Sequence, residues 1–358
     1  MIVFYLIIII YCLSIFYLAI RFVITKNDNY SQIKNYSVSI LIPFKNEENN
    51  LKLLVNDIIK QDYPKEKIEI IFIDDNSTDK GSEIIKGFEK DYQNIKYLAS
   101  QEQGKKNALK LGLKESKSEI IIHTDADVSL NKDWINTIVN SFIDEKILLS
   151  FGSVIFEHSS FFEKLQSLEL ISLSGIAAST GIIKHPVLIS GANLAYRKNI
   201  KQDFIESINN IASGDDMFFL EKIKKKYPKS TKYIKDKNNI VRTKAEKNIN
   251  SFIHQRIRWA GKTKKMKDLE IILSGIVSFI ANISVIIVLV SAIWTNNLVL
   301  ILTVVSFKFI TELFVLTIYS KYFKQLKLIN YFPILFIFYP FYIIIIGVLS
   351  MFVNPKWK

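Results

Sequence analysis

The two ends of this sequence are far more apolar than its middle, and this contrast limits the folds available to the chain. Residues 2–20 carry no charge, and a helix of that length, rising about 1.5 Å per residue, crosses a hydrocarbon core of about 30 Å. A cleaved signal peptide would carry basic residues before its apolar run, whereas here Arg21 and Lys26 follow it. The sequence therefore favours an uncleaved anchor, with residues 1–22 as its membrane segment.

The last third of the chain repeats the apolar pattern. Three stretches are long enough to span a bilayer: residues 271–294, 297–319 and 330–353. The break at 294–297 is uncharged, while the break at 320–330 holds three lysines. Basic loops stay on the cytoplasmic side. The sequence thus predicts a membrane domain over residues 270–358, a middle region that faces the cytoplasm, and an N-terminus outside the inner (plasma) membrane.

One ion pair is predicted inside these spans. Lys308 and Glu312 are four residues apart, so they share one face of a helix. A lone charge in the bilayer costs roughly 3 kcal/mol or more, and we therefore expect both side chains to point into the helix bundle and not at lipid. The pair serves either packing alone, which we favour, or a groove for the polar headgroup of an acceptor.

The composition of the chain excludes several classes of protein. Hydrophobic residues make up 49% of the chain, which is too many for a disordered protein. Cys12 is the only cysteine, so neither a disulfide scaffold nor a cysteine-based zinc site is possible. The net charge is +13, and residues 221–247 hold eleven basic and three acidic residues. Such a segment suits anionic membrane lipid or a solvated surface; we expect no nucleic acid partner.

Residues 36–265 alternate strand and helix patterns. Strands are expected at 38–42, 68–73, 95–98 and 119–123, and helices at 47–59, 79–88 and 105–114. This alternation predicts an α/β domain with a mostly parallel sheet and helices on both faces. In such sheets, ligands bind beyond the carboxyl ends of the strands. The first strand–helix turn carries neither GxGxxG nor GxxxxGK[ST], which disfavours a nicotinamide-type dinucleotide site and a P-loop.

An acidic pair follows the fourth expected strand. Asp125 and Asp127 are two residues apart directly after an apolar run, so both carboxylates can reach one hard cation. Mg²⁺ and Mn²⁺ take oxygen ligands, commonly one or two carboxylates together with substrate phosphates. A solvated loop would give the same letters, and the place of the pair after a buried strand is what favours a metal site.

Two further motifs lie later in the domain. Asp215 and Asp216 open an apolar run, where they can cap a helix or hold a general base beside a substrate. Gln255, Arg258 and Trp259 stand at spacings of three and four, so one helix face presents all three. That face suits a sugar or phosphate pocket, or equally a membrane-surface helix with Trp and Arg at the headgroups.

Together, the motifs in this order resemble glycosyltransferase family 2, the inverting nucleotide-sugar transferases with the GT-A fold. The similar segments are VSILIPFKNEENN, IEIIFIDDNSTD, GKKNAL, DAD, SGDD and QRIRW, the last of which matches the QxxRW of that family. The resemblance covers about residues 38–265. It implies an α/β GT-A domain, a nucleotide-sugar donor, a Mg²⁺ or Mn²⁺ cofactor, and the membrane anchoring of the family's membrane-bound members.

The resemblance also implies a role for each matched residue. Glu47, Asp75 and Asp74 hold the nucleoside, and Lys105 lies near the diphosphate. Asp125 holds the metal and the donor, together with Asp127. Asp216 is the catalytic base, with Asp215 as its neighbour. Gln255, Arg258 and Trp259 line the acceptor and diphosphate side.

The acceptor and the mode of transfer are less constrained than the donor side. QxxRW is frequent in processive synthases of the cellulose, chitin and hyaluronan type, but one span before the domain and three after it are few for a translocation channel. We therefore favour transfer of single sugars to a lipid-linked or polysaccharide acceptor over polymer synthesis. A non-enzymatic nucleotide-sugar-binding membrane protein would have no need of a base, and a transporter would need more spans.

One more helix is expected at residues 158–182. It has a smooth side of apolar and small residues, which suits either the membrane surface or the border of an acceptor site. We favour the membrane surface.

Overall fold

The computed structural model describes residues 2–28, 34–208, 214–291 and 298–353. The helices are α1 (Ile2–Ile24), α2 (Glu48–Ile59), α3 (Gly81–Asp91), α4 (Lys105–Glu115), α5 (Trp134–Ser141), α6 (Phe161–Ile182), α7 (Lys201–Ser207), α8 (Asp215–Lys226), α9 (Ile249–Gly261), α10 (Leu269–Ser291), α11 (Leu298–Tyr322) and α12 (Phe332–Phe352). The strands are β1 (Val38–Phe44), β2 (Ile68–Asp74), β3 (Ile95–Ala99), β4 (Ile120–His123), β5 (Leu149–Phe151), β6 (Val154–Glu157), β7 (Leu194–Arg197), β8 (Thr231–Tyr233) and β9 (Val241–Lys244).

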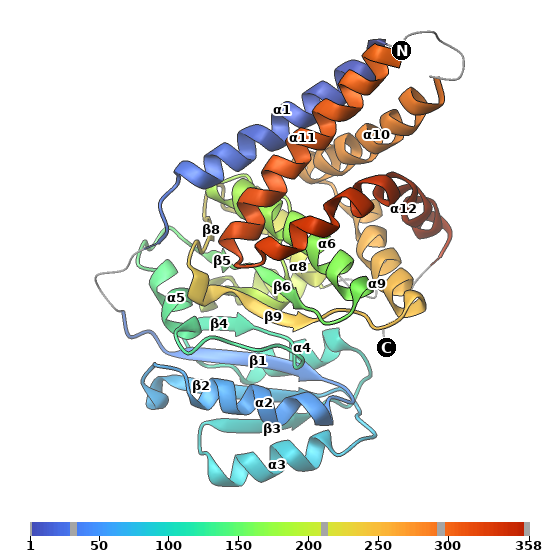
Figure 1. The fold of residues 1–358 in the computed structure, drawn as a ribbon. Helices are drawn as coiled ribbons and strands as arrows, with labels where there is room; N and C mark the ends of the chain where they lie inside the picture. Colours follow the sequence, from blue (N-terminus) through green and yellow to red (C-terminus); the bar gives the residue numbers. More distant parts are fainter. Residues whose placement is uncertain (1, 29–33, 209–213, 292–297, 354–358) are drawn as a thin grey trace.

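The domain between the apolar ends is built on a seven-stranded sheet in the order β3-β2-β1-β4-β7-β5-β8 (Figure 1). Strands β1 to β4 are parallel, and β7 runs antiparallel to both β4 and β5. A separate parallel pair, β6 and β9, lies beside this sheet. The predicted α/β fold with a mostly parallel sheet is confirmed, and each of the four predicted strands is present within two residues of its expected ends.

The first strand is longer than its sequence suggests. The expected strand ended before Pro43, because proline lacks the backbone N–H of a sheet ladder, yet β1 continues to Phe44. The pairing of β1 with β4 ends at Leu41, and only β2 pairs with the last residues of β1. The missing N–H at Pro43 therefore interrupts no ladder on the β4 side.

Both faces of the sheet are covered, and one of the two cores extends into the apolar helices. On one face, Ile40 and Phe72 pack with Leu51 of α2. On the other face, a second cluster runs from Leu41 through α6 to Tyr319 of α11. The α/β domain and the apolar helices thus share a hydrophobic core, which fixes their relative position.

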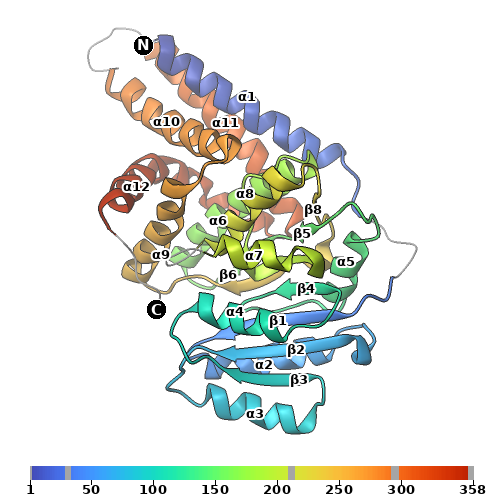
Figure 2. The same ribbon diagram turned by 180° about the vertical axis from the view of Figure 1, so that it is seen from behind.

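Helix α6 is the element that joins the two parts. It packs against β6 on one side and against α1 and α11 on the other, and Figure 2 shows it between the sheet and the apolar helices. At Gly175 a Cβ atom would lie 2.1 Å from the Tyr319 ring, so only glycine permits this approach. Ser179 and Tyr319 join their hydroxyl groups at 2.8 Å. The membrane-surface position that we favoured for this helix is wrong, because both parts of the protein bury it.

Four helices are long and apolar enough to cross a membrane, as the sequence predicts: α1, α10, α11 and the segment Leu326–Phe352, which includes α12. Helices α1, α10 and α11 run side by side (Figures 1 and 2). The expected break at 294–297 lies outside the described residues.

Helix α12 is placed differently from the other three. Just before it, the ring of Tyr331 packs against Phe161 of α6 at 5.6 Å. In its middle, Tyr342 stacks on Phe252 of α9 at 5.5 Å. After its end, Val353 lines a cavity of the domain, described in the next section, to which Asp216 also contributes. Both ends of α12 therefore lie against the domain, and Figure 1 shows the helix crossing the direction of α11.

The ion pair predicted in the second C-terminal span lies inside the helix bundle, as expected. Lys308 is 1% exposed and its Nζ lies 2.7 Å from Oε1 of Glu312. The Tyr11 hydroxyl of α1 donates to the same oxygen at 2.8 Å, and Nζ also donates to Asn282 of α10 at 3.4 Å. The pair ties α1, α10 and α11 together, and neither Lys308 nor Glu312 lines the cavity described below.

We predict that replacing the pair as a whole is tolerated. Removing one partner leaves a buried charge unpaired, which costs about 3–5 kcal/mol, whereas apolar replacement of both is often neutral or stabilising. Lys308→Met with Glu312→Leu should therefore melt in detergent at or above the temperature of the wild type, while Glu312→Leu alone should melt lower. Loss of sugar transfer in the double variant at normal expression would instead support the acceptor groove.

The basic segment at residues 221–247 does not form an uninterrupted positive surface. Lys222 pairs with Glu206, and Lys224 pairs with Asp268 and Glu270. Lys226 pairs likewise with an acidic residue of α7. Part of its charge is thus neutralised locally, in keeping with the solvated surface.

Candidate active site

A cavity of about 1150 Å³ lies at the carboxyl ends of β1, β2 and β4, between the sheet and the helices α6, α8 and α9. Ten of the eleven residues singled out from the sequence line it: Glu47, Asp75, Lys105, Asp125, Asp127, Asp215, Asp216, Gln255, Arg258 and Trp259. These residues come from segments more than 200 positions apart in the chain. The fold therefore brings nearly the whole predicted set together at one place.

The eleventh residue, Asp74, does not line the cavity. Its Oδ1 accepts from the backbone N–H of Ser77 at 2.8 Å, and its Oδ2 accepts from the hydroxyl of Tyr97 at 2.9 Å. Both carboxylate oxygens are thus engaged in holding the turn after β2. The geometry gives Asp74 a place behind Asp75 and not on the cavity wall.

Asp75 has one free position for a ligand. Its Oδ1 accepts from the N–H of Gly104 at 2.5 Å, and Gly104 has a φ of +113°, which a residue with a Cβ rarely adopts. Its Oδ2 is buried and has no hydrogen-bond partner within the described part of the chain. Buried polar atoms are nearly always satisfied, so a donor group from a bound molecule fits here.

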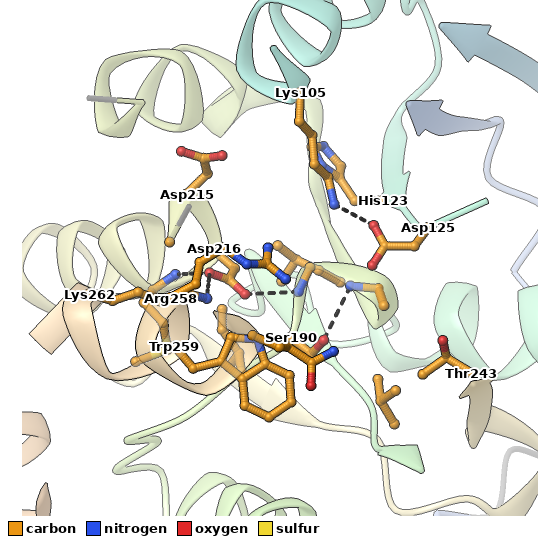
Figure 3. Close-up of a pocket in the computed structure, with 18 of the residues that line it drawn as sticks. Lys105, His123, Asp125, Ser190, Asp215, Asp216, Thr243, Arg258, Trp259 and Lys262 are labelled. Carbon is orange, nitrogen blue, oxygen red and sulfur yellow. Dashed lines mark hydrogen bonds and ion pairs between the residues drawn. The ribbon is translucent and has the colours of Figure 1, made fainter. Parts of the chain in front are cut away.

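The two carboxylates after β4 have different partners: a charged lysine for Asp125 and a neutral hydroxyl for Asp127. Asp125 forms an ion pair with Lys105 at the start of α4 (Figure 3). Asp127 accepts from the hydroxyl of Thr243 at 3.0 Å. Burial, followed by the nearby charge of Asp125, raises the pKa of Asp127, so this position favours a cation that would offset both charges.

The donor set is too small to close a metal site by itself. Among the residues that the structure describes, no group of three or more His, Cys, Asp or Glu side chains could hold a metal ion. His123 at the end of β4 packs against Phe204 and Tyr196, and burial is the main cause that lowers its pKa to about 3. His123 is therefore a neutral packed side chain. Two carboxylates with room for phosphate oxygens match what Mg²⁺ and Mn²⁺ require.

Asp215 and Asp216 open α8 and diverge from each other (Figure 3). Asp216 Oδ2 accepts from the N–H of Gly191 at 3.1 Å, and Oδ1 accepts from its neighbour Met217 at 2.8 Å. Lys262 adds an ion pair to Oδ1 at 3.4 Å. Although burial alone would raise it, the pKa of Asp216 is lowered by Lys262 and by these backbone N–H groups. Asp216 is thus an ionised carboxylate on the cavity wall.

Asp215 has a different environment. It forms an ion pair with Lys106 of α4 at 3.1 Å. Burial is the largest cause acting on its pKa, which is raised. The two adjacent carboxylates are therefore attached to different elements, Asp215 to α4 and Asp216 to the end of α9.

Lys106 and Lys262 were not singled out from the sequence. Lys262 follows Gln255, Arg258 and Trp259 at the next helical spacing, seven residues after Gln255, so the periodicity that selected those three residues also points to it. Lys106 stands beside Lys105, but no sequence pattern indicates that it contacts Asp215. Only the approach of α4 to α8 shows its partner.

We predict that Lys262→Met changes the pH dependence of turnover. The ammonium group of Lys262 helps to keep the pKa of Asp216 below its ordinary value, so its removal should raise that pKa. The family resemblance of the sequence implies that Asp216 is the catalytic base, and a base must be deprotonated to act. The acidic limb of the kcat profile should therefore move to higher pH. Lys265→Met, on an exposed lysine of the same segment, serves as the control. An unmoved limb would contradict the role of Lys262.

Helix α9 presents the last three predicted residues. Asn248 caps it by accepting from the N–H of Ser251 at 2.9 Å. Gln255 donates to Oε1 of Glu246 at 3.0 Å, and Glu246 itself lines the cavity. Arg258 and Trp259 reach the same wall (Figure 3). The face predicted from spacing is thus the face that meets the cavity.

Another part of the cavity wall is apolar. It includes Leu170, Leu173 and Ala177 of α6, Ile271 of α10, and Ile343 and Val353 from α12 and its end. The α6 part of this wall agrees with the alternative that the sequence left open for the helix over residues 158–182, the border of an acceptor site. No sequence pattern indicates the parts from α10 and α12, whose residues are ordinary apolar positions of helices. The cavity therefore joins a charged half at the sheet edge to an apolar half formed with the membrane-type helices.

Comparisons with known proteins agree with this architecture. Residues 39–204 match the family model for glycosyl transferase family 2. The glycosyltransferase AglE of Haloferax volcanii is 28% identical over 195 residues, which cover 52% of this chain and 60% of that protein. The beta-monoglucosyldiacylglycerol synthase of Nostoc is 37% identical over 113 residues, covering 31% of this chain and 24% of that protein. The match thus covers less than two thirds of the length of each of these relatives.

The fold itself has a solved counterpart. The mannosyltransferase PcManGT from Pyrobaculum calidifontis, solved in complex with GDP-Man and Mn²⁺, has a TM-score of 0.60 at 15% identity and covers 93% of this chain and 99% of that one. The expected GT-A fold is therefore confirmed, and the family model supports assignment of the domain to glycosyltransferase family 2.

Proposed function

We propose that this chain, with its family 2 GT-A domain, is a membrane-bound inverting glycosyltransferase that moves a sugar from a nucleotide-sugar donor to a lipid-linked acceptor. The observation that carries this proposal is the mixed lining of the cavity, which combines carboxylates and lysines at the sheet edge with apolar side chains from α6, α10 and α12. A charged half suits a nucleoside diphosphate, and an apolar half suits the lipid part of an acceptor.

The donor would occupy the sheet edge. Glu47 and the unsatisfied Oδ2 of Asp75 can accept from hydroxyl or base groups of the nucleoside. Lys105 and Arg258 would face the diphosphate. Asp125 and Asp127 would hold Mg²⁺ or Mn²⁺ together with phosphate oxygens, which parallels the GDP-Man and Mn²⁺ named for PcManGT. When bound, this ion offsets negative charge on the leaving nucleoside diphosphate.

The residues of this chain then supply one displacement step. The hydroxyl oxygen of the acceptor forms a bond to the anomeric carbon, and the bond from that carbon to the phosphate oxygen breaks. Asp216 takes the hydroxyl proton, and the nucleoside diphosphate leaves with the electron pair. The ionised state of Asp216, supported by Lys262 and two backbone N–H groups, makes it ready to accept a proton. A single attack inverts the configuration and needs no covalent nucleophile.

The acceptor side points to a lipid-linked molecule more than to a soluble glycan. Leu170, Leu173 and Ala177 would face its apolar part, while Gln255 and Trp259 would border its sugar or headgroup. The names of two relatives also refer to lipid-linked molecules: one is a beta-monoglucosyldiacylglycerol synthase and the other a sugar transferase for a dolichyl-linked acceptor. A product one sugar longer than the acceptor would distinguish this activity from polymer synthesis.

The domain would face the cytoplasm, where nucleotide sugars are made. The lysines at 320–330 favour this side by the positive-inside rule. Three crossings by α1, α10 and α11 would leave the N-terminus outside. Because both ends of α12 lie against the domain, α12 would rest in the inner surface of the membrane and would not cross it.

This topology predicts a labelling pattern. In intact cells, a cysteine placed at residues 295–297 should react with an impermeant maleimide, while cysteines at 322–328 and at Val353 should react only after permeabilisation. The control is the parent with Cys12→Ala, which removes the natural thiol. Labelling of Val353→Cys from outside would show that α12 crosses the membrane; the reverse of the whole pattern would invert the orientation.

The function itself is tested with the purified full chain. A panel of nucleotide sugars is incubated with Mg²⁺ or Mn²⁺, with and without a lipid extract as acceptor, and release of the nucleoside diphosphate is measured. We expect one donor to release its diphosphate much faster when the extract is present, with the sugar recovered on lipid. Lack of release from every donor, with folded protein and extract, would contradict the proposal.

A further inference from the structure

The buried side chain of Arg256 is not part of the cavity wall, although it stands between Gln255 and Arg258 on α9. It is 3% exposed, and its guanidinium points away from the cavity to Glu169 of α6. Nη2 and Nε of Arg256 donate to Oε2 of Glu169 at 2.7 Å and 3.1 Å. A charge buried this completely is retained in a fold only when it is paired and hydrogen-bonded.

Glu169 connects this pair to a third helix. Its Oε1 accepts from the hydroxyl of Tyr342 in α12 at 3.0 Å, and Glu169 is 6% exposed. Both carboxylate oxygens are therefore engaged, one by α9 and the other by α12. Buried Arg256 and Glu169, together with half-buried Tyr342, form a node between the domain and the last apolar helix.

The same guanidinium touches two residues that do line the cavity. Nη1 of Arg256 donates to Oε1 of Gln255. Its Cζ lies 4.4 Å from the centre of the Trp259 ring, a cation–π contact. Arg256 thus contacts Gln255 and Trp259 from behind while being fixed by Glu169. A guanidinium suits this task because its planar fork stacks on a ring and donates in several directions at once.

We propose that Glu169 and Arg256 are positioning residues, which hold Gln255 and Trp259 in the orientation that sugar transfer requires and couple that orientation to α12. This inference rests on the proposed function of the cavity. Glu169 touches no reacting atom and acts through Arg256. Its loss should therefore lower the catalytic constant without removing the donor site, whose residues Asp75 and Asp125 lie on other elements.

The chain offers a matched control for this inference. Glu312 in the helix bundle has the same surroundings in kind: it accepts from a buried cation, Lys308, and from a tyrosine hydroxyl, that of Tyr11. Glu312 does not line the cavity. A glutamine at either position removes a similar ion pair from the interior of the protein. Only the ion pair of Glu169 is in contact with Gln255 and Trp259, through Arg256.

The experiment compares Glu169→Gln with Glu312→Gln, both measured per folded molecule in the full-length detergent-solubilised enzyme. We expect Glu169→Gln to lower kcat about 10- to 100-fold, the size of effect that a misplacement of about 1 Å produces, with little change in the KM for the donor. Glu312→Gln should keep the kcat of the wild type. Glu169→Asp retains the charge and should recover part of the loss.

A second readout does not depend on turnover. Tryptophan emission from Trp259 should change in Glu169→Gln, because the guanidinium over its ring loses its carboxylate anchor; the same change measured in a Trp259→Phe background gives the contribution of the other tryptophans. Should Glu169→Gln itself fail to fold, Glu169→Asp and Arg256→Lys carry the test, and Arg256→Lys should lose turnover because an ammonium cannot bridge Glu169 and Gln255.

The possible failures are distinguishable. Wild-type kcat and unchanged Trp259 emission in folded Glu169→Gln would overturn the inference and leave the proposed function intact. Equal loss of kcat in Glu169→Gln and Glu312→Gln would also overturn it, since a purely structural role predicts that result. A wild-type enzyme that releases no nucleoside diphosphate would contradict the proposed function and, with it, the link to sugar transfer; Trp259 emission would then decide only whether Glu169 and Arg256 position Trp259.

Discussion

Asp216→Asn is expected to lower turnover by roughly 10²- to 10⁴-fold, the usual contribution of a positioned general base. The amide keeps the size of the side chain and can still accept from the N–H groups of Gly191 and Met217, so α8 should start as before. It cannot take the proton of an acceptor hydroxyl. The measurement is steady-state release of nucleoside diphosphate, with donor affinity determined separately by calorimetry.

Asp215→Asn is the matched comparison for this variant, one position earlier on the same helix start. Asp215 pairs with Lys106 and is directed to α4, so its loss should reduce turnover by much less than the loss of Asp216. Donor affinity should remain near that of the wild type in Asp216→Asn. Loss of donor binding in that variant, or equal losses from both substitutions, would point to a structural cap in place of a base.

Asp127→Asn is expected to remove most turnover while the fold stays intact. Burial and Asp125 raise the pKa of Asp127, so a neutral amide removes a charge that the fold itself disfavours, and the free energy of unfolding should not decrease. Metal affinity should fall by more than the roughly 10- to 100-fold that loss of an outer-shell partner costs. Manganese binding, followed by electron paramagnetic resonance, reports this directly.

Thr243→Val provides the outer-shell comparison, because the Thr243 hydroxyl donates to Asp127 at 3.0 Å and valine has nearly the same shape. This variant should weaken metal binding by about 10- to 100-fold and so be milder than Asp127→Asn. Excess EDTA should stop turnover in the wild type, and added Mg²⁺ or Mn²⁺ should restore it. Full activity in EDTA would contradict the metal role of Asp125 and Asp127.

Much of this site was predictable because its residues stand at fixed places relative to local elements. Asp75 and Asp125 follow apolar strands, and parallel strands bring their carboxyl ends to one edge of the sheet. The spacing of Gln255, Arg258 and Trp259 put them on one helix face. In each case the sequence pattern lies within a few residues of the side chain that lines the cavity, so a short stretch of sequence is enough to predict its position.

Other predictions failed or fell short where a distant element changed the environment. The helix over 158–182 was expected on the membrane surface, but α11 covers it, as the approach of Tyr319 to Gly175 shows. Asp74 was grouped with Asp75, yet Tyr97 of the next strand engages it and keeps it off the cavity wall. Neither partner is close in sequence to the residue whose position it decides.

The sequence by itself determined the apolar segments, the alternation of strands and helices, and the residue types gathered at the sheet edge, because hydrophobic periodicity and strand order are local properties of the chain. Only the tertiary structure decided that Lys262 faces Asp216, that Arg256 turns to Glu169 and away from the cavity, and that both ends of α12 return to the domain. These are contacts between elements that lie far apart in the chain. Their formation depends on how whole surfaces pack, and the spacing within one element does not identify the partner on another.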